Sequence, residues 1–540
     1  MDSGSEQKTS RPVGFFCLVL HAHLPYVRHP EDEDFLEEDW LYEAMTETYL
    51  PLLDGMRRLR EDRIPFRLTM SISPPLAEML ADPLLQERFD RRLQRLLELS
   101  RKEVHRTSKK PNQAFHESAL MYQAMFERAS TLYHEVYQRN LLNGFRELQE
   151  QGYLEIITCA ATHGLLPLMH TPNAVRAQIQ VAIENYKKHF DCEPKGIWLP
   201  ECGYDPRLDD LLDESGLNFF FLDTHGILNG SPPPKYGSYA PVLIPTKVAA
   251  FARDVETSRQ VWSREIGYPG DFEYREFYRD LGYDAFYDYI QPYLHKDGVR
   301  RGIGIKYHRI TGVGVDLAGK EPYRPQLARQ RVIEHTRHFI ENRCKQLEEA
   351  APLMDIPPVI VAPYDAELFG HWWFEGPIFI EQIFREMVES PERIQPVTPS
   401  EYLSRRHRLQ MIQPATSTWG HQGHFDVWLN ETTDWIYRHL HHCEQRMVEL
   451  VKEYPQTVGI KRRVLNQMAR ELLLAQSSDW AFIMTSNTAM SYARRRTREH
   501  IHRFLQLDEQ MQNFCIDENQ LKELEWKDNL FSEIDYRAYR

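Results

Sequence analysis

Seven short apolar segments, each followed directly by polar residues, constrain the fold of this chain more than any other feature. Helical patterns separate them, so the chain alternates between segments typical of buried strands and segments typical of helices. Such alternation is typical of parallel β/α units, whose strands end at one shared mouth. We therefore predict an α/β fold with a (β/α) barrel; an open doubly wound sheet is the alternative, although no glycine-rich phosphate loop follows the first segment. The segments cover residues 14–20, 67–73 and 154–161, the run ending at Glu201, residues 219–222 and 248–251, and the run from Val359 to Asp365.

The length of 540 residues predicts more than one folding unit, because single hydrophobic cores stop growing near about 250–300 residues. We predict a disordered tail over residues 1–12, a catalytic barrel over 13–405 and an all-helical C-terminal domain over 406–540. The barrel carries insertions at about 230–320, where a proline-rich loop (230–241) and an aromatic-rich subdomain (262–311) interrupt the β/α pattern. Helical periodicity in the C-terminal part is clearest near residues 433–453, 459–476 and 490–512, and Arg494–Arg496 in the last of these is predicted to be a solvated helix face.

Charge and cysteine usage restrict the partners and the compartment. The formal net charge of -14 argues against nucleic acid and anionic membranes, so a neutral substrate is expected. The seven cysteines are scattered without a C-x-x-C pair, and the first residues are polar with no apolar signal core. These features predict a reducing compartment, with cytoplasmic as the default, and a monomer or weak homo-oligomer.

Two acidic residues stand at the ends of the fourth and seventh segments. Retaining glycoside hydrolysis needs one ionised carboxylate that attacks the sugar and one protonated carboxyl that serves as acid and base, about 5–5.5 Å apart. Glu201 and Asp365 are placed to supply such a pair across a barrel mouth, each beside aromatic residues. A structural role for a carboxylate at a strand end is the alternative.

His21 and His23 end the first segment, and their spacing leaves three interpretations open. Metal-dependent amidohydrolases and deacetylases present two ligands in this way, and His163, His225 and Asp365 are available to complete a shell. Hydrogen bonding to a substrate and a role in the core are the other two interpretations.

Large aromatic residues in polar, loop-like surroundings are candidate sugar-stacking platforms, although core packing explains such residues equally well. Asp479 follows two serines, and helix capping is its simplest explanation. The candidate platforms are Trp40, Trp262, Trp372, Trp419 and Trp428.

Together these residues resemble glycoside hydrolase family 57 and, within it, the 1,4-α-glucan branching enzymes. The resemblance extends over nearly the whole chain and rests on several long motifs. They are H-A-H-L-P-Y (21–26), E-E-D-W-L-Y-E (37–43), A-T-H-G (161–164), W-L-P-E-C-G-Y (198–204), R-D (253–254), W-S-x-x-x-G-Y-P-G-D (262–271), P-Y-D-A-E-L-F-G-H-W-W-F-E-G-P (363–377) and S-S-D-W (477–480).

The resemblance implies a distorted TIM-like (β/α)7 barrel, a helical C-terminal domain, and a retaining mechanism on α-glucan without metal or cofactor. By motif position it makes Glu201 the nucleophile and Asp365 the general acid/base. It implies a flexible active-site loop carrying Tyr236, although Lys235 and Ser238 depart from the residues that branching-type members often carry. It also implies that His21, His23 and His163 bind the sugar and that Trp40, Trp262, Trp419 and Trp428 line the glucan groove. We predict further substrate contacts from Arg253, His371, Trp372 and Asp479.

The expected reaction is cleavage of an α-1,4 bond followed by transfer of the glucan to the 6-hydroxyl of an acceptor. An α-amylase or a 4-α-glucanotransferase on the same scaffold is the nearest alternative. A metal-dependent deacetylase or amidohydrolase, and a catalytically silent glucan-binding protein, remain as further alternatives.

Overall fold

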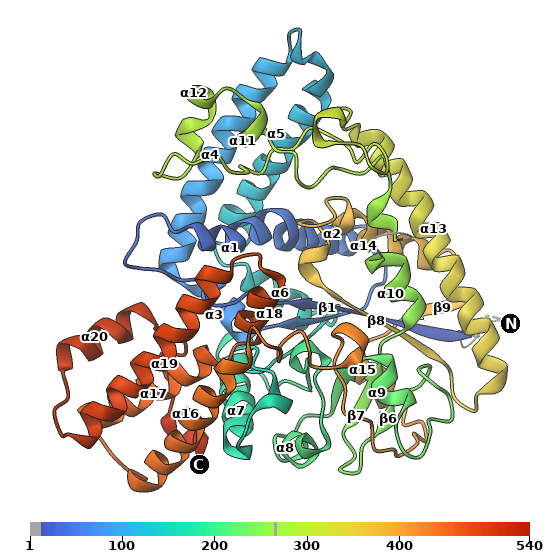
Figure 1. Cartoon of the computed structure of the whole chain (residues 1–540). Coiled ribbons are helices and arrows are strands. Elements are labelled where there is room, and N and C mark those ends of the chain that lie inside the picture. Colours follow the sequence, from blue (N-terminus) through green and yellow to red (C-terminus); the bar gives the residue numbers. More distant parts are fainter. Residues whose placement is uncertain (1–11, 264–266) are drawn as a thin grey trace, which may run out of the picture.

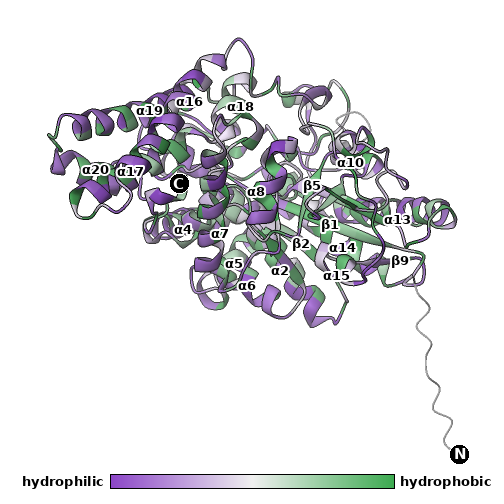
Figure 2. Cartoon of the chain, turned by 90° about the horizontal axis from the view of Figure 1, so that it is seen from below, coloured by the Kyte–Doolittle hydropathy of each residue, from purple (hydrophilic) through white to green (hydrophobic). Residues whose placement is uncertain are grey.

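The computed structural model describes residues 12–263 and 267–540. The tail expected over residues 1–12 therefore lies outside the described residues, apart from Pro12. Two mainly parallel β-sheets form the centre of the fold, helices surround them, and a group of helices from the C-terminal part packs against one end (Figure 1). In Figure 2 the strands have hydrophobic colours, whereas the surrounding helices mix both kinds of residue.

The first sheet has the order β3-β2-β1-β8, and β9 pairs with the first residues of β1; all pairings in it are parallel. The second sheet has the order β4-β5-β7-β6 and is parallel except for β6. All seven predicted segments contain a strand, and the short strands β6 and β9 are additions to the prediction. The strands are β1 (Gly14–Ala22), β2 (Leu68–Ile72), β3 (Leu154–Ile157), β4 (Gly196–Ile197), β5 (Phe219–Leu222), β6 (Val242–Leu243), β7 (Ala249–Ala252), β8 (Val359–Asp365) and β9 (Ile394–Pro396).

Alternate residues of the strands face two different cores, as the twofold repeat of a strand requires. Phe15, Cys17 and Val19 of β1 belong to a small buried cluster that also contains residues of β5, β7 and β8. This cluster therefore draws on both sheets. The residues between them, such as Phe16 and Leu18, belong to the large core that the helices share. Both faces of the strands are thus buried, which explains why the strands read as continuous apolar runs.

Backbone hydrogen bonds connect the two sheets at two places, although the strands still form two separate sheets. An isolated parallel bridge joins Thr158, just after β3, to Ile197 of β4. At the other edge, the backbone N–H of Asp254 donates to the carbonyl of Val361 at 2.8 Å. The topology gives two sheets, so the fold is α/β as predicted, while the closed (β/α)7 barrel stays a prediction.

Helices cover the outer faces of the sheets, and several begin at side-chain caps. Asp82 accepts hydrogen bonds from two backbone N–H groups at the start of α4, and Thr398 forms a capping box with Glu401 in α15. Within the described residues no helix combines the length and apolar character needed to cross a bilayer. The helices before the C-terminal part are α1 (Asp39–Ala44), α2 (Leu50–Glu61), α3 (Pro74–Ala81), α4 (Pro83–Thr107), α5 (His116–Thr131), α6 (Leu142–Glu150), α7 (Pro172–Phe190), α8 (Asp209–Glu214), α9 (Thr224–Leu228), α10 (Val255–Trp262), α11 (Leu281–Asp284), α12 (Tyr287–Ile290), α13 (Pro325–Ala350), α14 (Gly376–Met387) and α15 (Pro399–Ser404).

The aromatic-rich insertion is largely irregular and contains the short helices α11 and α12. It lies beside α4 and α5, away from the sheets (Figure 1). Tyr289 and Tyr307 anchor it by donating hydrogen bonds to the buried Glu103 of α4.

The C-terminal part is helical, as its periodicity predicts. One correction concerns Arg496, which is buried rather than solvated: its guanidinium donates to Asp528 at 3.1 Å, and Arg503 bonds the other oxygen of the same carboxylate. Arg494 and Arg495 are exposed as predicted. The helices of this part are α16 (Asp434–Glu453), α17 (Ile460–Ala475), α18 (Ser478–Ser486), α19 (Met490–Gln512) and α20 (Glu518–Lys527).

Replacing Asp528 with alanine is expected to lower the free energy of unfolding by about 3–5 kcal/mol, because it leaves the Arg496 charge buried without its partner. Chemical denaturation followed by circular dichroism measures this loss. Glu523→Ala is the matched control, since it removes an acidic residue of the same region whose pair with Lys527 lies at the surface. Equal stability of the two variants would contradict this account of the buried pair.

Candidate active site

The carboxyl ends of the central strands bring the predicted site residues together. His21 on β1 and Asp365 on β8 are direct neighbours in the parallel register. Glu201 lies in the short turn that follows β4, and His163 lies in the turn after β3. The C-terminal part contributes the first turn of α18, which carries Ser478 and Asp479. The site is therefore built from both parts of the chain.

Glu201 is a buried carboxyl with a fixed orientation. Ser478 Oγ donates to Glu201 Oε1 at 2.9 Å, and the indole N–H of Trp419 donates to Oε2 at 2.8 Å. The backbone adopts a left-handed conformation at Glu201, with φ of +61°, and such a conformation in a residue other than glycine costs about 1–3 kcal/mol. Burial raises the pKa of Glu201 to about 7, while the hydrogen bonds from Trp419 and Ser478 oppose the rise. The carboxyl is thus held at the boundary between its two protonation states near neutral pH.

A chain of hydrogen bonds leads from the sheet to Glu201. His163 Nδ1 lies 2.8 Å from Ser478 Oγ, His163 Nε2 lies 3.0 Å from His21 Nε2, and His21 Nδ1 lies 3.2 Å from Ser71 Oγ. Burial lowers the pKa of both histidines well below the usual range, so both rings are neutral near pH 7.

Neutral rings and single hydroxyl protons fix the direction of this chain. Because Ser478 donates to Glu201, it accepts from Nδ1–H of His163, whose Nε2 is then an acceptor. His21 therefore donates from Nε2 and accepts at Nδ1 from Ser71. Every donor points toward Glu201, and this arrangement favours the ionised form of its carboxyl.

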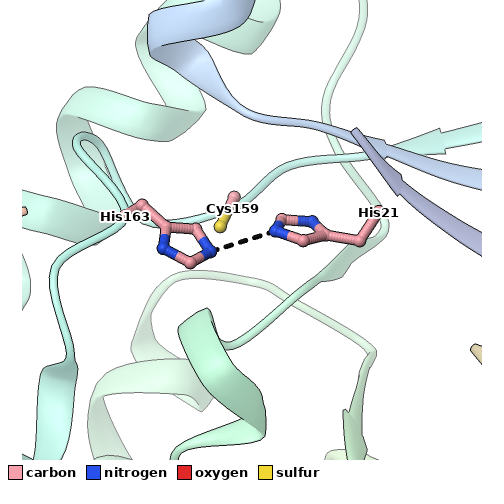
Figure 3. A group of neighbouring side chains, drawn as sticks. All are labelled: His21, Cys159 and His163. Atoms are coloured by element: carbon pink, nitrogen blue, oxygen red, sulfur yellow. Dashed lines mark hydrogen bonds between the residues drawn. The ribbon is translucent and has the colours of Figure 1, made fainter. Parts of the chain in front are cut away.

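His21, Cys159 and His163 also form a possible metal-ligand group, drawn in Figure 3. One ligand atom from each lies within 4.8 Å of the others. The two facing nitrogen atoms already share a hydrogen bond, and burial raises the pKa of the Cys159 thiol well above its usual range. Metal binding would have to remove that thiol proton and break the histidine pair. The group therefore suits a hydrogen-bonded core better than a metal centre.

Asp365 is the second predicted carboxyl. Burial raises its pKa well above the usual range, and the neighbouring carboxyls of Glu367 and Glu201 raise it further. Of the residues that the structure describes, none donates a hydrogen bond to its carboxyl. Burial also raises the pKa of Glu367 to about 7, against the effect of the hydrogen bond from Tyr49. Asp365 therefore holds its proton more tightly than an ordinary aspartate and can donate it.

His23 and Asp479 form a pair at the edge of the site. Their side chains meet at 2.9 Å, and Ser477 donates to the same carboxylate oxygen at 2.5 Å. Burial acts to raise the pKa of Asp479, but the charge and hydrogen bond of His23 outweigh it and hold this pKa at about 2. The expected capping role of Asp479 is therefore wrong: its carboxylate makes no cap hydrogen bond to α18. It instead fixes the ring of His23, which lies over His163 with 3.8 Å between centroids.

A cleft of about 600 Å³ opens beside these residues, and we call it the outer cleft. Its position explains Trp40, His371 and Trp372, which were predicted to contact substrate and which all line it. The residues that define the outer cleft are His23, Trp40, Phe277, Glu367, Trp372 and Asp479.

A second aromatic surface lies directly at Glu201. The indole of Trp419, which donates to Glu201, has Trp262 at 6.5 Å and the guanidinium of Arg253 at 5.7 Å from its ring. Arg253 in turn donates to Asp223 at 3.2 Å. The predicted residues Arg253, Trp262 and Trp419 are therefore gathered at the site.

Two predicted contacts lie elsewhere. Trp428 is only 1% exposed, and its ring fills the space where a Cβ on Gly420 would sit, so it packs in the core and presents no face to a sugar. The hydroxyl of Tyr236 donates to Asp355 at 2.8 Å, and Lys235 bonds the same carboxylate. This contact holds the loop beside the amino-terminal end of β8, whereas Asp365 ends that strand about 20 Å away. In this structure Tyr236 therefore does not cover the site.

Sequence reasoning missed the roles of Ser478, Glu367 and Tyr49 around the two carboxyls. Ser478 and Glu367 stand inside motifs that were recognised, yet neither was singled out. The signal available for Ser478 was its place between two other polar residues, 477 and 479, at the start of a helix. No local pattern marks Tyr49, which reaches Glu367 from a helical segment more than 300 residues earlier.

Comparison with known proteins identifies the family of the chain. The model of the family described as Glycosyl hydrolase family 57 matches residues 17–350. A second model, described as 1,4-alpha-glucan branching enzyme, C-terminal, matches residues 439–539. A curated 1,4-alpha-glucan branching enzyme of Thermococcus kodakarensis is 36% identical over 97% of this chain and 78% of its own length.

Solved structures resemble the chain over almost its whole length. The alpha-amylase AmyC of Thermotoga maritima is 48% identical with a TM-score of 0.91, covering 97% of this chain and 99% of its own. A branching enzyme of the same family from Pyrococcus horikoshii is 35% identical with a TM-score of 0.87, covering 98% of this chain and 97% of its own.

The hydrogen bond from Ser478 gives a test of the site's electrostatics. Ser478→Ala removes a donor that lowers the pKa of Glu201, so this pKa is expected to move above about 7. Infrared titration of the carboxyl C=O stretch measures the shift, and Glu201→Gln assigns the band. Ser478→Thr, which keeps a hydroxyl, is expected to stay near the wild-type value. An unchanged pKa in the alanine variant would contradict the directed chain of hydrogen bonds.

Proposed function

Because the chain belongs to glycosyl hydrolase family 57, we propose that it is a 1,4-α-glucan branching enzyme. It cleaves an α-1,4 bond of a glucan and rejoins the freed end as an α-1,6 branch. The observation that carries the chemistry is a pair of buried carboxyls, Glu201 and Asp365, whose surroundings differ. The match of residues 439–539 to the C-terminal region of branching enzymes supports branching as the outcome.

The first step forms a covalent glucosyl enzyme. The Glu201 carboxylate attacks C1 of an internal glucose while the bond from C1 to the glycosidic oxygen breaks. Asp365 transfers its proton to that oxygen, and the leaving chain departs. The raised pKa of Asp365 supports this role, because the proton is present at the start. The two hydrogen bonds on Glu201 aim both of its oxygens and favour the ionised form that attacks.

The second step transfers the glucan. Asp365, now a carboxylate, removes the proton of an acceptor 6-hydroxyl, and that oxygen attacks C1 as the bond to Glu201 breaks. Two displacements at C1 retain its configuration. The ring nitrogen atoms of His21 and His163 are already hydrogen-bonded, so these two histidines orient Ser478 beside Glu201. His23 and Ser477 both bond one carboxylate oxygen of Asp479, and its second oxygen can accept from a hydroxyl of the sugar held between the two carboxyls.

We also propose the domain division expected from the sequence, with a distorted (β/α)7 barrel over 13–405 and a helical domain over 406–540. The Thr158–Ile197 bridge, the hydrogen bond between Asp254 and Val361, and the buried cluster common to both sheets support closure of the barrel. The start of the second family match at residue 439 supports a separate C-terminal unit.

The cellular setting follows from the same proposal. A branching enzyme serves the synthesis of glycogen-like α-glucan, and the proposed protein works in the cytoplasm, without cofactor, as a monomer or weak homo-oligomer. All seven cysteines are unpaired, which supports a reducing compartment.

An α-amylase is the second candidate, favoured by the 48% identity to a structure described as one. The two activities share the first step and differ only in whether water or a sugar hydroxyl completes the second. The nature of the product therefore separates them.

Proton NMR of amylose treated with the enzyme is expected to show new α-1,6 anomeric signals with few new reducing ends. Glu201→Gln removes the nucleophile but keeps the shape of the side chain, so the new signals are expected to disappear. Reducing ends without α-1,6 signals would replace branching with amylase activity as the function.

The pH dependence of kcat/KM tests the assigned roles. Glu201 must be ionised and its pKa is about 7, so activity is expected to fall as the pH drops below about 7. Asp365 must be protonated and its pKa is raised, so it defines the alkaline limb. An acidic limb near the usual pKa of a glutamate, about 4.3, would argue against the burial of the nucleophile.

A further inference from the structure

The outer cleft is larger than one sugar needs, and beyond His23 and Asp479 its walls include segments that carry neither of the two reacting carboxyls. One wall is the aromatic-rich insertion, which contributes Phe277, Tyr278 and Tyr283. The loop after β8 contributes Trp372, and α18 contributes Phe482. A volume of about 600 Å³ lies within the range of ligand-binding pockets.

Aromatic side chains in this cleft are exposed to an unusual degree. Trp372 is 57% exposed, Tyr278 69% and Tyr283 55%. Trp372 is nevertheless held in place, because it stacks on Phe277 with 4.6 Å between centroids and 19° between ring planes. Exposed apolar surface costs free energy in water, and gathered, ordered aromatic faces mark a place where a ligand stacks.

The polar groups of the cleft select a neutral ligand rich in hydroxyl groups. Glu43, Glu47 and Asp280 line it, and Lys306 is the basic residue among them. Glu47 binds the ring of His371 at 2.8 Å, which fixes both side chains. Carboxylates disfavour an anionic ligand, whereas they accept hydrogen bonds from sugar hydroxyls. Aromatic faces with such acceptors between them match the alternating apolar and polar surfaces of a glucan.

The outer cleft approaches the catalytic centre through Glu367, in the turn that directly follows Asp365. Glu367, which lines it, follows Asp365 by two residues and is the neighbouring carboxyl that most raises the pKa of Asp365. The surface formed by Arg253, Trp262 and Trp419 is a separate one at Glu201, and none of these three lines the outer cleft. The described residues thus offer two aromatic surfaces, one associated with each carboxyl.

We propose that the outer cleft binds the glucan chain that leaves in the first step and then the acceptor chain that enters in the second. The proposal rests on the proposed function, since only a transferase needs a bound acceptor. Both chains carry the oxygen that exchanges its proton with Asp365, so both must lie on the Asp365 side of C1. The surface at Glu201 then holds the chain that stays on the enzyme.

Binding of maltoheptaose to the inactive Glu201→Gln protein tests the cleft without any reaction. Adding Trp372→Ala or Tyr278→Ala is expected to weaken the affinity about 3- to 10-fold in calorimetry. Phe286→Ala is the matched control, because this aromatic residue of the same insertion is 89% exposed but does not line the cleft. Trp372→Phe, which keeps a ring that can stack, is expected to restore most of the affinity. Equal affinities in the control and cleft variants would overturn the proposal.

The active enzyme supplies the second test. In Trp372→Ala and Tyr278→Ala the ratio of new α-1,6 bonds to new reducing ends is expected to fall at least about threefold, because water competes better when the acceptor binds weakly. An unchanged ratio would overturn the assignment to the acceptor even if affinity falls. If the wild type forms no α-1,6 bonds while the binding results hold, the branching function fails and the cleft remains a glucan site.

Discussion

The hydrogen bond from Ser478 to Glu201 is the contact on which the site depends most. It joins a residue of the C-terminal helices to a carboxyl at the end of a strand, 277 positions earlier in the chain. The same hydroxyl accepts a hydrogen bond from His163. It is therefore the last link in the chain of hydrogen bonds that runs from Ser71 to Glu201. Next to it, Asp479 orients His23. Without the first turn of α18, the carboxyl would lose one of two donors and the histidine pair would lose its direction.

Burial of the carboxyl groups is the second physical effect on which the site depends, because it raises their pKa values. Three carboxyls, Glu201, Asp365 and Glu367, lie close enough for their charges to influence one another, and burial is the largest cause of the raised pKa in each. They differ in their hydrogen bonds: Glu201 receives two from side chains, whereas Asp365 receives none from the described residues. Carboxyl groups in one low-dielectric region thus differ in how readily they ionise, because only Glu201 receives two hydrogen bonds that favour its anion.

The strands were predictable because their period and their polar ends are local properties of the sequence, and all seven predicted segments hold one. The carboxyl pair and the histidines were predictable for the same reason. Trp428 and Tyr236 were not, because their surroundings depend on remote residues: Gly420 leaves room for the indole, and Asp355 binds the tyrosine hydroxyl. Tyr49 shows the same limit, since its contact with Glu367 spans most of the chain. Whether the sheets close into one barrel depends on single hydrogen bonds that no pattern encodes.

Both parts of the chain contribute residues to the site, and this restricts how the sequence of each part can change during evolution. Because Ser478 and Asp479 reach across to Glu201 and His23, the two parts of the chain cannot be exchanged independently between relatives. A recombinant that joins the strands of one homologue to the C-terminal helices of another is expected to be active only if the contacts of Ser478 with Glu201 and of Asp479 with His23 are kept. The insertion that walls the outer cleft carries neither carboxyl of the reacting pair, so it is free to vary. Sequence changes that alter the structure of the glucan product are therefore expected in the insertion, while the contacts of Ser478 and Asp479 with Glu201 and His23 stay the same.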